Sequence, residues 1–134
     1  MKLSAIYKCF SDETRLRILN LLSVSPLCVC HIQAVLHKSQ VVISQHLAYL
    51  RERGLVDGQR YKNWMLYSLP ARRPAALDAN LQCLREAGEP ILQKDAQRLE
   101  ALMGSKSVRN LLDEGCCARL AAASTLKTSR KSPR

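Results

Sequence analysis

The stretch LCVCHIQAVLHKSQVVISQHLAYLRERG, residues 27–54, decides the fold because it has the pattern of two helices joined by a short polar break. Ser25-Pro26 precedes the first helix, where serine caps well and proline suits the first helical position. His37-Lys38 forms the break, Ser39 is the expected N-cap of the second helix, and Gly54 follows its end. The pattern predicts a helix-turn-helix.

The second helix of this pair has one apolar and one polar face. Ile43, Leu47 and Leu50 recur at i, i+4 and i+7 and predict a buried stripe. The opposite face, called here the base-contacting face, consists of Val41, Ser44, Gln45 and Ala48. A face of small and polar side chains is what a helix needs to lie against base edges in a major groove, so this helix is predicted to bind DNA.

Two helices are predicted before this pair. The first lies within residues 3–10, and Ser11 is expected to cap the second, SDETRLRILNLLS. Its leucines predict an inward stripe, while Arg15, Arg17 and Asn20 are expected to point outward.

A hairpin is predicted after the pair. Leu55-Val56 begins one strand, residues 64–69 form the other, and the polar tip 58–63 lies between them. A cationic hairpin behind two helices predicts a mainly α fold with a β-hairpin wing, a winged helix-turn-helix.

Residues 74–103 return to a helical pattern, with Leu77, Leu81 and Leu84 in one stripe and Cys83 expected to pack there. Terminal helices of this kind usually pack against a second copy, so a homodimer is predicted; the alternative is that they cover their own domain. The chain divides into a DNA-binding and dimerisation domain, 1–103, and a C-terminal extension, 104–134, whose basic tail is expected to be disordered.

The composition narrows the function classes. The 134 residues suffice for one domain, and their net charge of +10 favours an anionic partner, either nucleic acid or a membrane surface. With no apolar run long enough to cross a bilayer and an early-charged N-terminus, a cytoplasmic protein is expected. There is no glycine-rich phosphate loop or catalytic triad order, so an enzyme is not predicted.

In addition to DNA binding, the sequence predicts a function for cysteine thiols. The cysteines are Cys9, Cys28, Cys30, Cys83, Cys116 and Cys117. In a chain expected in the cytoplasm, free thiols, metal ligands or redox groups are favoured over structural disulfides. Cys28 and Cys30 are expected near a helix N-terminus, which favours the thiolate, and thiolates suit trivalent arsenic or antimony or copper(I) better than magnesium or calcium.

The segments SDETRLRIL, PLCVCHI, SQVVISQHLAYLRERGLV and NWMLYSLP, within residues 5–70, resemble the ArsR/SmtB family of metal-responsive repressors. The resemblance is greatest to the branch that responds to arsenite and antimonite, whose motif is close to ELCVCDLC. It implies a homodimer that holds double-stranded operator DNA of an arsenic-resistance-type operon and releases it when the metalloid binds the cysteines. The family's zinc, cobalt and nickel sensors use histidines on the last helix, and this chain has none there.

The motif departs from the family at two positions. The family often has a third cysteine where this chain has Gln33, and an aspartate where it has His31. A third sulfur would then come from Cys116 or Cys117, from Cys9 or from an exogenous thiol; a two-sulfur site is the other alternative. His31 is either a further donor or a solvated residue.

Helix geometry suggests how the ion would act. Residues i and i+2 of a helix project about 200° apart, so one ion could bind both cysteines only by bending or unwinding that turn. Binding is therefore expected to move residues 39–53 away from their DNA-binding angle.

Gln40 and Gln45 can each form two hydrogen bonds to adenine, and Val41 can pack against a thymine methyl group. The basic residues can form ion pairs with phosphates. His46 is either a phosphate or a packing contact. The candidate DNA contacts are Lys38, Ser39, Gln40, Val41, Ser44, Gln45, His46, Arg51, Arg53, Arg60 and Lys62.

Two other functions remain open at this point. In a redox-switched regulator, Cys28 and Cys30, or Cys116 and Cys117, would oxidise. In a protein-interaction module, the winged helix would have no operator.

Overall fold

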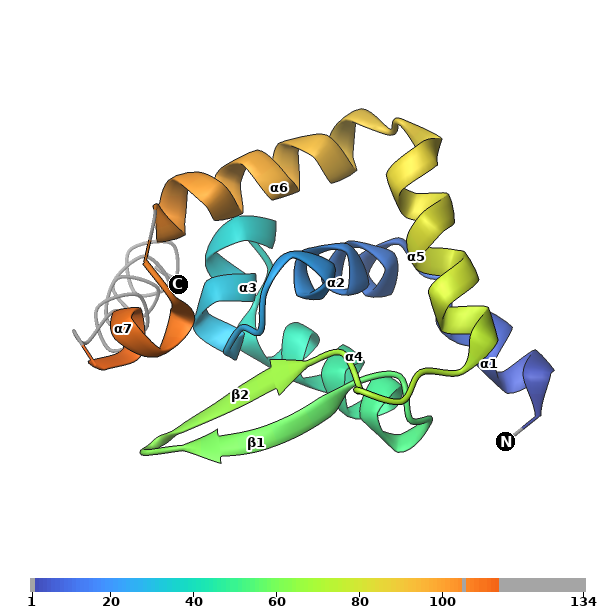
Figure 1. The fold of residues 1–134 in the computed structure, drawn as a ribbon, viewed down its shortest axis with the longest axis horizontal. Coiled ribbons are helices and arrows are strands. Elements are labelled where there is room, and N and C mark those ends of the chain that lie inside the picture. The colour runs from blue at the N-terminus through green and yellow to red at the C-terminus, as the bar shows by residue number, and fades with distance from the viewer. Residues whose placement is uncertain (1, 105, 114–134) are drawn as a thin grey trace, which may run out of the picture.

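A computed structural model describes residues 2–104 and 106–113 of the chain (Figure 1). In chain order the elements are α1 (Leu3–Cys9), α2 (Glu13–Val24), α3 (Val29–Leu36), α4 (Gln40–Glu52), β1 (Asp57–Tyr61), β2 (Trp64–Ser68), α5 (Ala75–Ala87), α6 (Pro90–Met103) and α7 (Val108–Asp113). This order confirms the predicted mainly helical fold with a two-stranded hairpin. None of the described helices is long and apolar enough to cross a bilayer.

Helix α2 occupies the centre of the molecule. It packs against α3, α4, α5 and α6, which surround it in Figure 1. Its side chains Ile18, Leu19 and Leu21 are fully buried. Burial of this apolar surface supplies the main driving force for bringing the other helices together.

The predicted features of α4 are confirmed. The Ser39 side chain accepts a hydrogen bond from the Val42 backbone N–H at 3.2 Å, as expected of an N-cap. Ile43, Leu47 and Leu50 are fully buried. Gly54, just beyond the helix, has a φ of 73°, a conformation that glycine adopts without steric cost.

The start of α3 differs from the prediction. The helix begins at Val29 with Cys28 as its N-cap, and Ser25-Pro26 lies outside it. The reason is a backbone bridge: the Leu27 N–H donates to the Tyr67 carbonyl at 2.9 Å, and the Tyr67 N–H donates to the Leu27 carbonyl at 2.7 Å. This pairing with β2 holds Leu27 outside the helix.

The N-cap of α2 also differs, by one residue. The side chain of Asp12, not that of Ser11, accepts from the Arg15 backbone N–H, at 3.0 Å. The Ser11 hydroxyl instead donates to the Lys8 carbonyl at the end of α1. Both residue types cap helices well, so local sequence could not separate them.

The hairpin is shifted relative to the prediction. β1 and β2 pair antiparallel from Asp57 opposite Ser68 to Tyr61 opposite Trp64. Leu55 and Val56 precede β1 and are buried in the core instead of beginning the strand. Arg60 therefore lies in β1, and the turn consists of Lys62 and Asn63.

Helices α5 and α6 cover their own domain. Leu77, Leu81 and Leu84 of α5 are buried, as are Leu92 and Leu99 of α6, with α5 against α1 and α2, and α6 against α2 and α3. The leucine stripe is thus used within one chain, and dimerisation stays a prediction. Cys83 was expected in this stripe, but it is exposed.

A buried ion pair joins α2 to α6. Arg17 Nε and Nη2 donate to the two carboxylate oxygens of Asp95 at 2.7 and 3.0 Å, and the Asp95 side chain is fully buried. The Asn20 side chain donates to the Leu92 carbonyl at 3.2 Å. The expectation that Arg17 and Asn20 point outward was wrong because α6 covers that face of α2.

Removing one partner of this pair should destabilise the domain strongly. Asp95→Ala leaves Arg17 buried without its carboxylate, so the free energy of unfolding should fall by about 3–5 kcal/mol in urea denaturation. Asp78→Ala, which removes an exposed pair with Arg73 at 3.6 Å, is the matched control and should cost about 1 kcal/mol or less. Equal losses in the two variants would contradict the importance of the buried pair.

Candidate effector site and nucleic-acid interface

Cys28 and Cys30 lie side by side at the start of α3. Cys28 is the N-cap and has extended backbone angles, φ −98° and ψ 169°, while Cys30 lies in the first turn. Their Sγ atoms are 2.7 Å apart. The prediction that the two side chains point in opposite directions was wrong because Cys28 is not inside the helix. One ion can therefore approach both sulfurs without unwinding α3.

His31 completes this group. It is fully buried, so it is not the solvated residue that the sequence analysis allowed. Its Nδ1 atom lies 3.1 Å from Cys28 Sγ and accepts from the Cys28 backbone N–H at 3.4 Å. An N–H can only donate, so the ring proton belongs on Nε2. Burial lowers the pKa of His31 to about 4, which keeps the ring neutral at pH 7.

We call Cys28, Cys30 and His31 the thiol–imidazole cluster. Its two Sγ atoms and the imidazole nitrogen lie within 4.8 Å of one another, close enough for one metal ion. The Cys-x-Cys pattern indicated the two cysteines, but only the fold shows that the histidine turns toward them.

Within the part of the chain that the structure describes, the remaining candidate sulfur, that of Cys9, is not in this cluster. Cys9 lies at the end of α1, where its Sγ donates to the Ala5 carbonyl and burial raises its pKa. Gln33 is half-buried on α3. Cys116 and Cys117, with the basic tail, lie outside the described residues, so their contribution of a third sulfur stays a prediction.

The thiol–imidazole cluster adjoins both elements that are expected to contact DNA. Cys28 directly follows Leu27, whose backbone pairs with Tyr67 of β2. Helix α3, whose N-cap is Cys28, packs against both α4 and β2. A displacement at Cys28 can therefore reach the hairpin through one residue and α4 through one helix.

Most of the base-contacting face of α4 is exposed. Val41 is 64% exposed, so its side chain is accessible to a partner. Gln40, Gln45 and Ala48 are also exposed, and Ser44 is half-buried. Ser39 is exposed as well, although its hydroxyl is already used in capping α4. These residues remain predicted DNA contacts.

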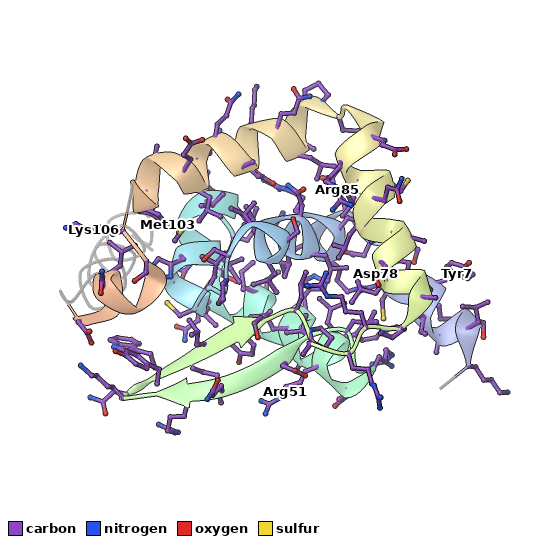
Figure 2. All side chains as sticks on the ribbon, in the orientation of Figure 1. Tyr7, Arg51, Asp78, Arg85, Met103 and Lys106 are labelled. Carbon is purple, nitrogen blue, oxygen red and sulfur yellow. The ribbon has the colours of Figure 1, made fainter. Side chains whose placement is uncertain are left out.

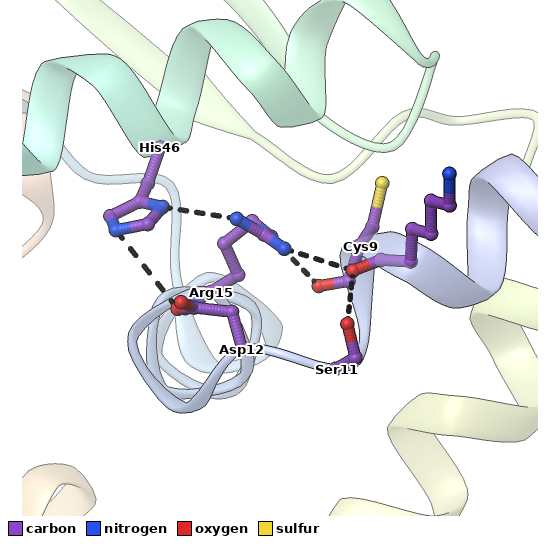
Figure 3. Close-up of polar contacts among 6 residues, drawn as sticks. Cys9, Ser11, Asp12, Arg15 and His46 are labelled. Carbon is purple, nitrogen blue, oxygen red and sulfur yellow. Dashed lines mark hydrogen bonds and ion pairs between the residues drawn. The ribbon is translucent and has the colours of Figure 1, made fainter.

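His46 instead contacts its own chain (Figure 3). Its Nδ1 lies 3.4 Å from Arg15 Nη1, and its Nε2 lies 4.0 Å from an Asp12 carboxylate oxygen. Arg15 also donates to the Lys8 and Cys9 carbonyls at 2.9 and 3.0 Å. This agrees with the packing alternative for His46, and Arg15 was wrongly expected to point outward.

Arg15 extends this contact to a second aromatic partner. Its guanidinium lies 4.3 Å from the Tyr49 ring, and the guanidinium of Arg53 lies 3.6 Å from the same ring. Arg15 thus joins α1, α2 and α4, a role that no sequence motif indicated. Arg53, a candidate phosphate contact, is half-buried here.

The remaining basic residues predicted to contact phosphates lie in or next to α4 and the hairpin. Arg51, labelled in Figure 2, is exposed and lies over Gly58, where an added Cβ would be 3.0 Å from its Nη1. Arg60 is exposed and Lys38 is half-buried. Lys62 pairs with Asp113 of α7, which raises the lysine pKa, and the Tyr61 hydroxyl donates to the same carboxylate.

Comparison with known proteins identifies the family. Residues 12–57 match the model of the arsR family of bacterial regulatory proteins. The chain is 39% identical to Arsenic resistance transcriptional regulator ArsR1 of Pseudomonas putida KT2440, over 75% of this chain and 79% of that protein. It is 38% identical to the Arsenical resistance operon repressor of Escherichia coli K12, over 69% of this chain and 84% of the repressor.

Solved structures agree with the sequence relatives. The fold is similar to HlyU from Vibrio cholerae N16961, with a TM-score of 0.57 and 30% identity, over 63% of this chain and 89% of that one. A second structure, titled reduced HlyU from the same organism, has the same TM-score and identity and covers 86% of that chain. The chain therefore belongs to the ArsR family and is a DNA-binding transcriptional regulator of winged-helix fold, not an enzyme.

Proposed function

We propose that this regulator represses an arsenic-resistance-type operon and leaves its operator when trivalent arsenic or antimony binds Cys28 and Cys30. The observation that supports this most directly is the contact between the two sulfurs at the junction of α3 and the hairpin. The names of similar proteins, which include an arsenical resistance operon repressor, support the choice of effector.

The ligation needs no electron transfer. Arsenous acid has three hydroxyl groups on its arsenic atom. Each thiol replaces one hydroxyl, forms one arsenic–sulfur bond and releases one water molecule. Two cysteines leave one position on arsenic for a third sulfur or a retained hydroxyl. Thiolate sulfur is a soft donor and suits this ion.

Ion binding would act through the backbone that follows the cysteines. The 2.7 Å separation of the sulfurs is shorter than two ligands of one ion allow, so binding must move them apart. A shift of Cys28 displaces Leu27, and with it the paired Tyr67 of β2, while α3 transmits the shift to α4. The ion releases DNA only to the extent that it binds the displaced arrangement more tightly.

The DNA-binding form would be a homodimer on a two-fold symmetric operator. Each α4 would enter a major groove, where Gln40 and Gln45 suit adenine and Val41 suits a thymine methyl group. Lys38, Arg51, Arg60 and Lys62 would contact phosphates on either side.

A redox switch is the second candidate function. The contact of the sulfurs also suits a reaction with peroxide: the two thiols lose two electrons and two protons, a sulfur–sulfur bond forms, and hydrogen peroxide becomes two water molecules. The similar structure titled reduced HlyU is consistent with redox chemistry in that relative.

Replacing both cysteines should abolish the arsenite response. In gel shifts with excess reductant, arsenite should release wild-type protein from its footprinted operator, whereas Cys28→Ser/Cys30→Ser should remain bound because hydroxyl oxygen is a poor ligand for a soft ion. Cys83→Ser, at an exposed position on α5, is the control and should respond normally. Release of the double variant by arsenite would refute the proposed site. Release by peroxide alone would favour the redox switch.

DNA contacts of α4 and of the hairpin should differ in their sequence dependence. Gln45→Ala should reduce discrimination between the operator and a scrambled duplex by about 1–3 kcal/mol, because it removes a base contact. Arg60→Ala should weaken binding to both duplexes alike and lower the salt slope by about one, because it removes a phosphate contact. Titrations on both duplexes at several salt concentrations measure the two effects. An equal loss on both duplexes for Gln45→Ala would exclude base recognition by that residue.

A further inference from the structure

We propose that His31 Nδ1 is a metal ligand, and that Cys28, Cys30 and His31 together bind a divalent ion of the zinc type. The proposal adds one ligand and one class of ion to the proposed function. It rests on that function in one respect, because it takes Cys28 and Cys30 as the thiolates that bind the effector. Two sulfurs and one imidazole nitrogen form a donor set that zinc accepts in a tetrahedral site with one open position.

The donor atoms need only a small adjustment to surround such an ion. With zinc–sulfur bonds of about 2.3 Å and zinc–nitrogen bonds of about 2.0 Å, a tetrahedral site separates two sulfurs by about 3.7 Å and a sulfur from a nitrogen by about 3.5 Å. The observed separations are 2.7 Å between the sulfurs and 3.1 Å from Cys28 Sγ to His31 Nδ1. The sulfurs must move apart by about 1 Å, which rotation of the two cysteine side chains together with a small shift of the Cys28 backbone can provide.

The imidazole already presents the correct atom. The Cys28 backbone N–H donates to Nδ1, so the lone pair of Nδ1 points toward the start of α3, where Cys28 Sγ lies. Helical backbone and complete burial hold the ring in this place. A ligand that is held in position before the ion arrives costs little conformational entropy on binding.

Ligation by His31 would also alter the start of α3. The Cys28 N–H would lose its acceptor when the ion takes the Nδ1 lone pair, and one half of the capping box at this N-terminus would open. Because Leu27 and its pairing with Tyr67 come next in the chain, a divalent ion would perturb the same backbone as the proposed metalloid.

The alternative role for His31 is capping alone. A cap at this position needs only a hydrogen-bond acceptor, and glutamine provides one in the same third position of many helices. The amide oxygen of glutamine is a harder donor than imidazole and a poorer ligand for zinc. His31→Gln therefore preserves the cap and removes the metal ligand, which separates the two roles.

The experiment compares zinc affinities of the reduced full-length chain by competition with a chromophoric chelator. His31→Gln should bind Zn²⁺ at least about tenfold more weakly than wild type, since even outer-shell partners of metal ligands contribute tenfold or more. His37→Asn, an exposed histidine at the αL C-cap of α3, is the matched control and should bind as wild type does.

A second measurement on the wild type does not depend on any variant. In nitrogen NMR of histidine-labelled protein, one equivalent of Zn²⁺ should shift the Nδ1 resonance of the buried His31 ring. The ring-nitrogen resonances of His37 and His46 should not shift. An unshifted ring together with equal zinc affinities in wild type and His31→Gln would overturn the proposal. If wild type bound zinc through His31 but ignored arsenite, the proposed function would fail and this inference would stand.

Discussion

The backbone pairing between Leu27 and Tyr67 is the constraint on which the thiol–imidazole cluster depends. Two hydrogen bonds, of 2.9 and 2.7 Å, fix Leu27 in extended form beside β2. Helix α3 can therefore begin only after Cys28, whose side chain folds back onto the first turn. Had the helix started at Pro26, the two sulfurs would have pointed about 200° apart. The geometry of the cysteines thus follows from a contact made by their neighbour.

The rest of the fold keeps that junction in place. α2 is the common packing partner of the helices around it, and its pair with Asp95 fixes α6 over α2. Arg15 links the end of α1 to His46 and Tyr49 of α4. The base-contacting face of α4 is therefore oriented by contacts on its buried side, which leaves exposed side chains such as Gln45 available for a partner.

Local features of the fold could be predicted from sequence, whereas non-local ones could not. The Ser39 cap and the stripe of Ile43, Leu47 and Leu50 depend on neighbours within α4, so the sequence pattern was sufficient. The late start of α3 and the burial of Arg17 depend on segments about 40 and 78 residues away, β2 and α6. For the site, the cysteine pair was predictable but the approach of His31 was not, because it requires Cys28 to be an N-cap.

Asp113 has a consequence for the electrostatics of the hairpin. Its carboxylate accepts from both Lys62 and Tyr61, so the turn of the wing already holds a counter-charge supplied by α7. A phosphate that approaches Lys62 meets an ammonium group whose charge is already partly balanced by this carboxylate, which reduces the net attraction. In the proposed complex with DNA, the attraction of the wing would therefore come mainly from Arg60, and the Asp113 carboxylate would oppose the approach of a phosphate to the end of the hairpin.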